Sequence, residues 1–207
     1  MKIQVVCFDI DGTLYPKWVT NWKLIRSCFP SLPLAMRYQR FRRHVRSAQH
    51  EQTVPANEQG FRERQARWMC SGSDEREIRH MALRVQHQFY DCWRASFSRL
   101  RPYHHLREAF EALITQGVTI AALSDFPIDS KLQALGVADL VAYAACTEQS
   151  GYLKPHPQPF LMVCQALKVS PDQVLYVGDS CKKDIVGASQ VGMRTALIDP
   201  AATDAKR

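Results

Sequence analysis

The sequence predicts an α/β fold, a doubly wound parallel sheet that carries an inserted α-helical segment. Two observations lead to this class. Short β-branched apolar segments alternate with amphipathic ones near both ends of the chain, and a long stretch between them has only helical periodicity. The composition agrees, because 46% hydrophobic and 23% charged residues in a chain of 207 are typical of a globular protein with a sizeable core.

Five short segments are predicted to be strands. The first is β-branched and almost wholly apolar, which suits a strand buried on both faces of a parallel sheet. The other four are of the same kind. The five segments are Ile3–Phe8, Val118–Ser124, Leu140–Tyr143, Val174–Val177 and Arg194–Ile198.

Amphipathic segments lie between most of these strands and are predicted to be helices. Glycines that follow them, at Gly117, Gly136 and Gly192, stand where helices commonly end. Alternation of strand and helix favours right-handed crossovers in a parallel sheet. The four segments are Tyr103–Gln116, Ile128–Leu135, Pro159–Leu167 and Ser180–Gln190.

The stretch from Tyr15 to about Arg101 contains no convincing strand. An amphipathic helix is expected to open near Ser73 and Asp74, because apolar residues then recur every three or four positions. This stretch also contains all four tryptophans, which suggests an apolar core of its own. The recurring apolar residues are Ile78, Met81, Ala82, Val85, Phe89, Trp93, Phe97 and Leu100.

The chain is therefore expected to form two domains. Residues 1–14 and 103–207 form the sheet domain, and residues 15–102 form the inserted helical domain. No stretch reaches the ~18 consecutive apolar residues of a membrane span, and the apolar run Ile3–Phe8 is too short for a signal peptide. We expect a cytoplasmic protein without membrane contact.

The net charge of +7 is divided unevenly along the chain. Residues 15–107 hold 18 Lys and Arg against 7 Asp and Glu, whereas the remainder holds 9 against 13. Such a basic segment is either a solvated helical surface or an attraction for an anionic ligand or nucleic acid, and charge alone favours neither. Within the run Arg37–Arg46, Tyr38, Phe41 and Val45 are expected to pack. Arg42 and Arg46 then form either an exposed helix flank, which is slightly favoured, or part of a ligand site.

Polar side chains follow four of the predicted strands. Because the ligand crevice of an open parallel sheet lies beyond the carboxyl ends of its strands, we expect these groups to converge. Any single one could instead be a helix cap, but several carboxylates together repel and need a cation, for which all-oxygen ligands favour magnesium. The groups are Asp9, Asp11, Ser124, Asp125, Lys154, Asp179 and Asp184.

The order of these motifs resembles the haloacid dehalogenase-like (HAD) superfamily, in its phosphatase subclass with a helical cap inserted after the first motif. The resemblance covers residues 2–200 and implies a Rossmann-like catalytic domain under a cap. It rests on Phe8-Asp-Ile-Asp-Gly-Thr-Leu14, Leu123-Ser-Asp125, Gly151-Tyr-Leu-Lys-Pro155 and Val177-Gly-Asp-Ser-Cys-Lys-Lys-Asp-Ile-Val-Gly-Ala188.

The resemblance also implies roles for the residues that match. Asp9 is the nucleophile that forms an aspartyl-phosphate, and Asp11 is the general acid and base. Asp11 favours phosphoryl chemistry, because family members that cleave carbon–halogen bonds do not have this aspartate.

The remaining matched residues are implied to bind phosphate or metal. Ser124 and Lys154 are catalytic groups that contact the phosphoryl group, and Asp9, Gly12 and Asp125 complete its binding site. The implied cofactor is Mg²⁺, held by Asp9, the backbone carbonyl of Asp11, Asp179 and, in the second shell or through water, Asp184.

The family pattern is not matched everywhere. Family members often have Asp at the position of His156, and a small or amide residue at the position of Asp125. These departures leave the implied catalytic groups in place, and they either alter recognition of the leaving group or have no effect.

The function expected from the resemblance is Mg²⁺-dependent hydrolysis of a small anionic phosphate monoester. Two alternatives stay open. The same motifs serve a phosphotransferase or mutase, and the arginines interleaved with aromatic residues would suit a module that binds nucleic acid or a protein partner. The intact set of implied catalytic residues argues against a purely binding protein. The sequence leaves the substrate and the oligomeric state open.

Overall fold

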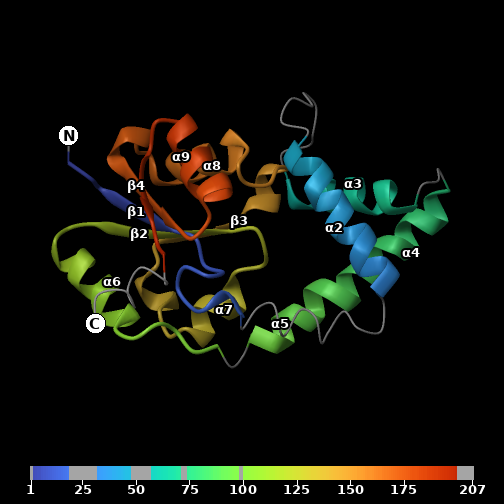
Figure 1. Ribbon diagram of the computed structural model, residues 1–207, viewed down its shortest axis with the longest axis horizontal. Coiled ribbons are helices and arrows are strands. Elements are labelled where there is room, and N and C mark those ends of the chain that lie inside the picture. The colour runs from blue at the N-terminus through green and yellow to red at the C-terminus, as the bar shows by residue number, and fades with distance from the viewer. Residues whose placement is uncertain (1, 19–31, 48–56, 71–73, 98–99, 200–207) are drawn as a thin grey trace.

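The computed structural model describes residues 2–18, 32–47, 57–70, 74–97 and 100–199 (Figure 1). Its centre is a five-stranded parallel sheet in the order β3-β2-β1-β4-β5. The α/β fold with a parallel sheet is confirmed. The strands are β1 Val5–Phe8, β2 Thr119–Ser124, β3 Tyr143–Cys146, β4 Val174–Gly178 and β5 Arg194–Leu197.

Helices cover both faces of this sheet, as a doubly wound fold requires. Figure 1 shows α8 and α9 on one face and α6 and α7 on the other. Successive residues of β1 face opposite layers, so that Val6 packs with Phe110 of α6 while Val5 packs with Phe160 of α8. These helices are α6 Leu106–Thr115, α7 Asp129–Ala134, α8 Pro157–Leu167 and α9 Val186–Gln190.

The third strand lies later in the chain than the sequence predicts. The prediction placed it at Leu140–Tyr143, whereas residues Ala138–Leu140 form a 3₁₀ turn and β3 begins at Tyr143. Its register is set by pairing with β2, from Ala121 opposite Tyr143 onward. The apolar run is uniform from residue 140 to residue 146, so its pattern alone does not locate the start of the strand.

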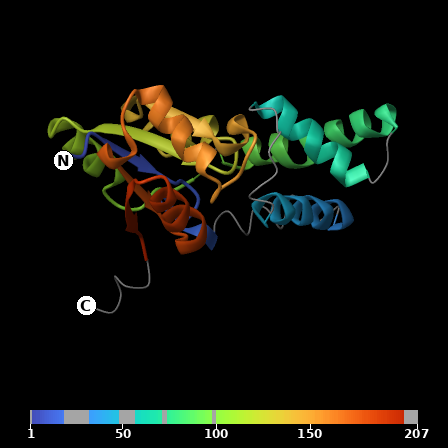
Figure 2. The ribbon, with the colours of Figure 1, turned by 90° about the horizontal axis from the view of Figure 1, so that it is seen from above.

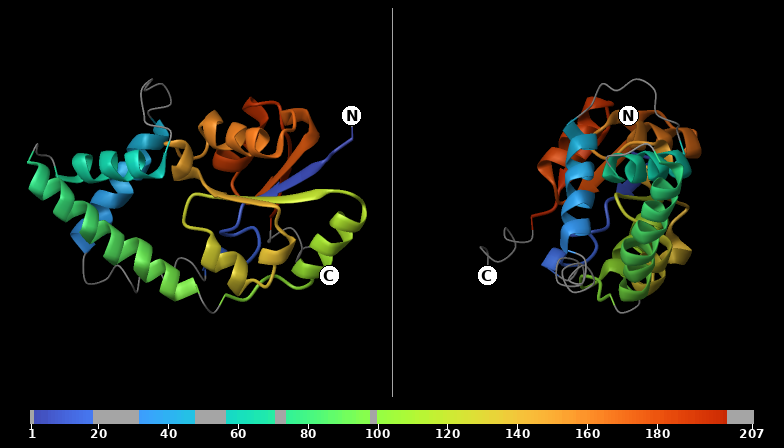
Figure 3. Two further views of the ribbon diagram at one scale, coloured as in Figure 1. Left: turned by 180° about the vertical axis from the view of Figure 1, so that it is seen from behind. Right: turned by 90° about the vertical axis from the view of Figure 1, so that its right-hand side faces the viewer.

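Helices fill the described part of the stretch between β1 and α6. We call residues 32–97 the helical segment; Figures 2 and 3 show it to one side of the sheet. Asp74 caps α4, as predicted, by accepting the Arg76 N–H at 2.9 Å; Ser73 lies outside the described residues. The segment comprises α2 Leu32–Ser47, α3 Glu58–Cys70, α4 Glu75–Val85, the π-helical turn η2 Gln86–Asp91 and α5 Cys92–Ser96.

Aromatic rings form much of the core of the helical segment. Tyr38 stacks on Phe89 with ring centroids 4.6 Å apart, and Trp93 is 2% exposed. Trp93 also packs edge-on against Phe126, which follows β2, with ring centroids 4.7 Å apart. The four tryptophans do not all contribute to this core, because Trp18 is 66% exposed, Trp68 is 39% exposed and position 22 lies outside the described residues.

The chain leaves the sheet side after Leu14 and returns to it at Tyr103. The Tyr103 N–H donates a hydrogen bond of 3.0 Å to the Leu14 carbonyl, so the two crossing points are adjacent. The division into a sheet domain of residues 1–14 and 103–207 and a cap of residues 15–102 stays a prediction. None of the helices in the described ranges is both long and apolar enough to cross a membrane, and the cytoplasmic location also stays a prediction.

Candidate active site

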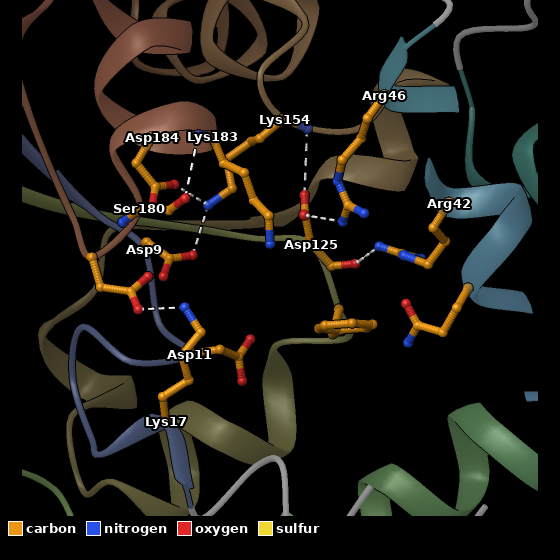
Figure 4. Close-up of a pocket in the computed structure, with 13 residues that line it drawn as sticks. Asp9, Asp11, Lys17, Arg42, Arg46, Asp125, Lys154, Ser180, Lys183 and Asp184 are labelled. Carbon is orange, nitrogen blue, oxygen red and sulfur yellow. Dashed lines mark hydrogen bonds and ion pairs between the residues drawn. The ribbon is translucent and has the colours of Figure 1, made fainter. Parts of the chain in front are cut away.

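A pocket of about 190 Å³ lies at the carboxyl ends of the strands (Figure 4). Its floor comes from the sheet side, with Asp9 after β1, Asp125 after β2 and Asp184 after β4. Its wall comes from helix α2, which contributes Arg42 and Arg46. The convergence of polar groups predicted from the strand ends is therefore present.

Asp9 is buried at the end of β1, the central strand of the sheet. Its N–H donates to the Val177 carbonyl at 2.8 Å, which ties the backbone at the end of β1 to β4. The carboxylate accepts hydrogen bonds from the Thr13 hydroxyl at 3.1 Å and from Lys154 at 2.6 Å. Burial raises the pKa of Asp9, and the nearby Asp184 carboxylate raises it further. The positive charge of Lys154 lowers this pKa, but the net shift is upward.

Lys154 is 2% exposed and bridges two carboxylates. Its Nζ donates to Asp9 at 2.6 Å, to Asp184 at 2.7 Å and to the Tyr176 hydroxyl at 3.0 Å. Although burial alone would lower the pKa of Lys154, Asp9 and Tyr176 hold it well above the usual value. Lys154 is therefore a fixed positive charge beside Asp9.

Three carboxylates form an acidic cluster that suits a divalent cation. Asp9, Asp179 and Asp184 each place an oxygen within 4.8 Å of the others. Glycines allow this close approach: a Cβ on Gly12, where φ is +105°, would lie 2.4 Å from the Asp179 carboxylate, and one on Gly178 would lie 2.5 Å from that of Asp184. Carboxylate oxygens are the ligands that magnesium prefers, so the residues fit the expected ion.

The side chain of Asp11 lies outside this cluster. Its carboxylate accepts hydrogen bonds from the Lys131 ammonium at 2.7 and 2.6 Å, from the Ser124 hydroxyl at 2.9 Å and from the Tyr15 hydroxyl. Burial alone would raise the pKa of Asp11, but Lys131 lowers it below the usual value. Ser124, expected to contact a phosphoryl group, contacts Asp11 in this structure.

Asp125 is a buried carboxylate that faces basic side chains. It accepts hydrogen bonds from Arg46 at 2.7 Å and from the Thr147 hydroxyl at 3.0 Å. The Asp125 carbonyl accepts a further bond from Arg42. This residue therefore ties the loop after β2 to helix α2.

The position of Arg42 corrects the expectation of an exposed arginine flank. Arg42 is 1% exposed; its guanidinium pairs with Glu148 and also donates to the Tyr38 hydroxyl at 2.9 Å. Arg46, one turn later, also faces the site, whereas Arg43 is exposed. The spacing of Arg42 four residues after the buried Tyr38 was a signal that it shares the packed face.

Lys131 and Glu148 are site residues that the sequence analysis missed. Lys131 stands in a short helix and Glu148 in a 3₁₀ turn, and nothing in their local patterns distinguishes them from surface residues. Both are 0% exposed. Their tertiary partners compensate the burial of their charge: Asp11 pairs with Lys131, and Arg42 and the Tyr90 hydroxyl contact Glu148.

The fold and the site define a class of α/β proteins in which a strand-end aspartate lies beside a lysine and an acidic cluster. The haloacid dehalogenase-like hydrolase family matches residues 3–192, and the chain belongs to this family. Its homologues include phosphatases. N-acetylmuramic acid 6-phosphate phosphatase of Pseudomonas aeruginosa is 25% identical over 96% of this chain and 82% of its own length. Glyceraldehyde 3-phosphate phosphatase of Methanopyrus kandleri is 28% identical over 95% and 84%.

Solved structures share the fold. A 2-haloacid dehalogenase from Pseudomonas syringae pv. Tomato DC3000 superposes with a TM-score of 0.64 at 24% identity, over 96% of this chain and 87% of that one. A putative HAD hydrolase of Bacillus subtilis bound to magnesium gives 0.62 at 14% identity, over 97% and 90%. At these identities the likeness concerns the fold alone.

Proposed function

We propose that the protein is a Mg²⁺-dependent phosphomonoester hydrolase that acts on a small anionic phosphorylated metabolite through an aspartyl-phosphate. The observation that carries the proposal is the placement of Asp9, which lies beside the Lys154 ammonium and within the acidic cluster with Asp179 and Asp184. The homologues named as phosphatases support it. The presence of Asp11 in the first motif separates the chain from dehalogenases that resemble it only in fold.

The residues that would hold Mg²⁺ are Asp9, Asp179, Asp184 and the backbone carbonyl of Asp11. When bound, the ion would supply positive charge that offsets repulsion between the Asp9 carboxylate and the substrate phosphate. Lys154 adds a second positive charge beside Asp9, and Thr13 donates a hydrogen bond that orients the Asp9 carboxylate.

The chain's own groups account for the two transfer steps. An Asp9 oxygen attacks phosphorus and forms the Asp9–phosphorus bond, while the bond from phosphorus to the leaving oxygen breaks. Lys131 keeps most of Asp11 in the carboxylate form, and the small fraction of Asp11 in the acid form gives the leaving oxygen a proton. Asp11, now a carboxylate, then takes a proton from water. The water oxygen attacks phosphorus, the bond to Asp9 breaks, and inorganic phosphate leaves.

The charge of the pocket supports a substrate with a second anionic group. The two arginines of helix α2 at the pocket, Arg42 and Arg46, already pair with Glu148 and Asp125. Among the described residues that line the pocket, the positive charge open to a ligand is that of Lys183, which Figure 4 shows directed into the pocket from the segment after β4. Burial lowers the pKa of Lys183, which is the effect expected of a lysine drawn out of water. A carboxylate or a second phosphate on the leaving group would neutralise part of this charge. The named relatives act on small phosphorylated sugars.

The proposal is tested by release of inorganic phosphate from a panel of monoesters, with Mg²⁺ and with a chelator. We expect Mg²⁺-dependent release, a lower KM for esters with a second anionic group than for uncharged ones, and loss of turnover in Asp9→Asn with the fold retained. Asp172 lies just before β4 and therefore at the amino ends of the strands, opposite the pocket; Asp172→Asn is the control and keeps activity.

Normal turnover by Asp9→Asn contradicts the role of Asp9. Release from every ester in the presence of chelator contradicts the role of the ion. Transfer of phosphate to a hydroxyl compound, without equal release of inorganic phosphate, would identify a phosphotransferase instead.

A further inference from the structure

Lys131 is a buried lysine whose one carboxylate partner among the described residues is Asp11. It belongs to helix α7, is 0% exposed, and places its ammonium 2.7 and 2.6 Å from the two oxygens of Asp11. A buried ammonium is costly unless an opposite charge compensates it, and lysines on short helices usually remain in water. Its position at Asp11 is therefore a specific arrangement.

The surroundings of Lys131 close it off from the pocket. The ammonium lies 4.7 Å from the ring centre of Phe97 and 5.4 Å from that of Phe126. Asp11 retains 14% exposure of its side chain, whereas Lys131 has none. Asp11 thus lies between the buried ammonium and the pocket.

Three donors from different parts of the chain fix the Asp11 carboxylate. One oxygen accepts from Lys131 and Tyr15, and the other accepts from Lys131 and Ser124. Lys131 is the only one of these three that contacts both oxygens and carries a charge. Without Lys131, the hydrogen bonds that oppose rotation of the Asp11 carboxylate toward a cation in the acidic cluster come from two neutral groups, the Tyr15 and Ser124 hydroxyls.

We propose that Lys131 is a positioning residue, which acts through Asp11 and holds its carboxylate where it exchanges a proton with the leaving group and with the hydrolytic water. The inference rests on the proposed function, because it needs Asp11 to be the proton-transfer group. The Lys131 ammonium contacts Asp11 and has no part in the roles proposed for the acidic cluster and Lys154; positioning of Asp11 gives this buried charge a function. Lys131 itself does not touch the reacting atoms.

The test measures the decay of the phosphorylated enzyme formed from p-nitrophenyl phosphate, whose leaving group departs without a proton. We expect Lys131→Met to slow decay by about 10- to 100-fold, because a small displacement of a catalytic group costs that much. Lys131→Arg restores part of the rate. Leu132→Ala, which loses buried packing on the same helix without contacting Asp11, keeps the decay rate of the wild type.

A double-mutant cycle separates positioning from a general structural role. In the Asp11→Asn background, Lys131→Met is expected to slow decay less than about twofold further, because both changes remove the same interaction. Full additivity, or wild-type decay in Lys131→Met, overturns the inference while leaving the proposed function intact. A wild type that forms no phosphorylated enzyme overturns both.

A crystal structure of Lys131→Met provides a measurement that does not depend on activity. We expect the Asp11 carboxylate to have left Ser124 or Tyr15. Retention of both contacts overturns the inference, whatever the kinetics show.

Discussion

At the scale of single residues, Asp125 is a carboxylate that basic neighbours keep ionised. Burial alone would raise its pKa, but Arg46, Lys154 and Arg42 together hold the pKa of Asp125 well below the usual range. In the unfolded chain the same group titrates near pH ~3.9. The folded protein therefore binds this proton only in stronger acid than the unfolded chain does.

This difference predicts how stability depends on pH. The contribution of Asp125 is fully present above about pH 4 and is lost as the pH falls from there toward the folded-state pKa. We expect Asp125→Asn to make the decline of the unfolding free energy below about pH 4 shallower than in the wild type. Urea unfolding between pH 7 and pH 3 measures it. Parallel curves for the two proteins would contradict the prediction.

Single residues also show which parts of the site a sequence reveals. Asp9 and Asp179 could be predicted because each directly follows a recognisable strand, and Asp184 because it lies in the segment after the same strand as Asp179; the sheet then brings the three together. Lys131 and Glu148 could not. Each of these buried charges depends on a partner more than 100 positions away in the sequence, and the neighbouring residues do not indicate that partner.

At the scale of elements, helix α4 has a defined beginning. The Asp74 carboxylate accepts the Arg76 N–H, and Glu75 and Glu77 stand in the first turn, where negative charge complements the helix dipole. The sequence predicted this start because Asp74 directly precedes the apolar periodicity. By contrast, the predicted start of β3 was wrong because a uniformly apolar run contains no residue that marks where a strand begins.

Removal of the cap measures its contribution. We expect Asp74→Ala to lower the free energy of unfolding by about 1 kcal/mol, since an N–H of the first turn loses its acceptor, and Asp74→Ser to lower it by only a few tenths. Chemical denaturation of the two variants checks this. Equal stability of the alanine and serine variants would show that the hydrogen bond does not stabilise the helix.

At the scale of the whole molecule, a buried ion pair joins the helical segment to the sheet. Arg42 of α2 pairs with Glu148 after β3, at side-chain exposures of 1% and 0%. The Tyr90 hydroxyl donates to the same carboxylate at 2.9 Å. Burial raises the pKa of Glu148 despite Arg42, so the carboxylate depends on these partners.

Breaking this pair should destabilise the protein strongly. We expect Arg42→Met to lower the free energy of unfolding by about 3–5 kcal/mol, because Glu148 stays buried without its counter-charge. Arg42→Met combined with Glu148→Met should recover part of the loss. Arg43→Met, on the exposed side of the same helix, is the matched control. A double variant that is less stable than Arg42→Met would argue against the electrostatic cause.

The same arrangement bears on the alternative of nucleic-acid binding, which stays a prediction. Arg42 and Arg46 point inward to Glu148 and Asp125, so part of the basic run is committed to the pocket. Arg40 and Arg43 remain exposed. The positive charge of the helical segment is thus shared between the site and the solvent.

The hydrogen bond between Leu14 and Tyr103 has a consequence for how such a chain can vary. It closes a loop whose two ends meet at one point of the sheet side. The entropy lost on closing a flexible loop rises only logarithmically with its contour length, by about 0.6 kcal/mol for each doubling. The pairing of β1 with β2 and β4 therefore fixes the position at which the sequence between Leu14 and Tyr103 is inserted, but it places little limit on the length of that sequence. A longer or shorter insertion at this position leaves the register of the strands unchanged.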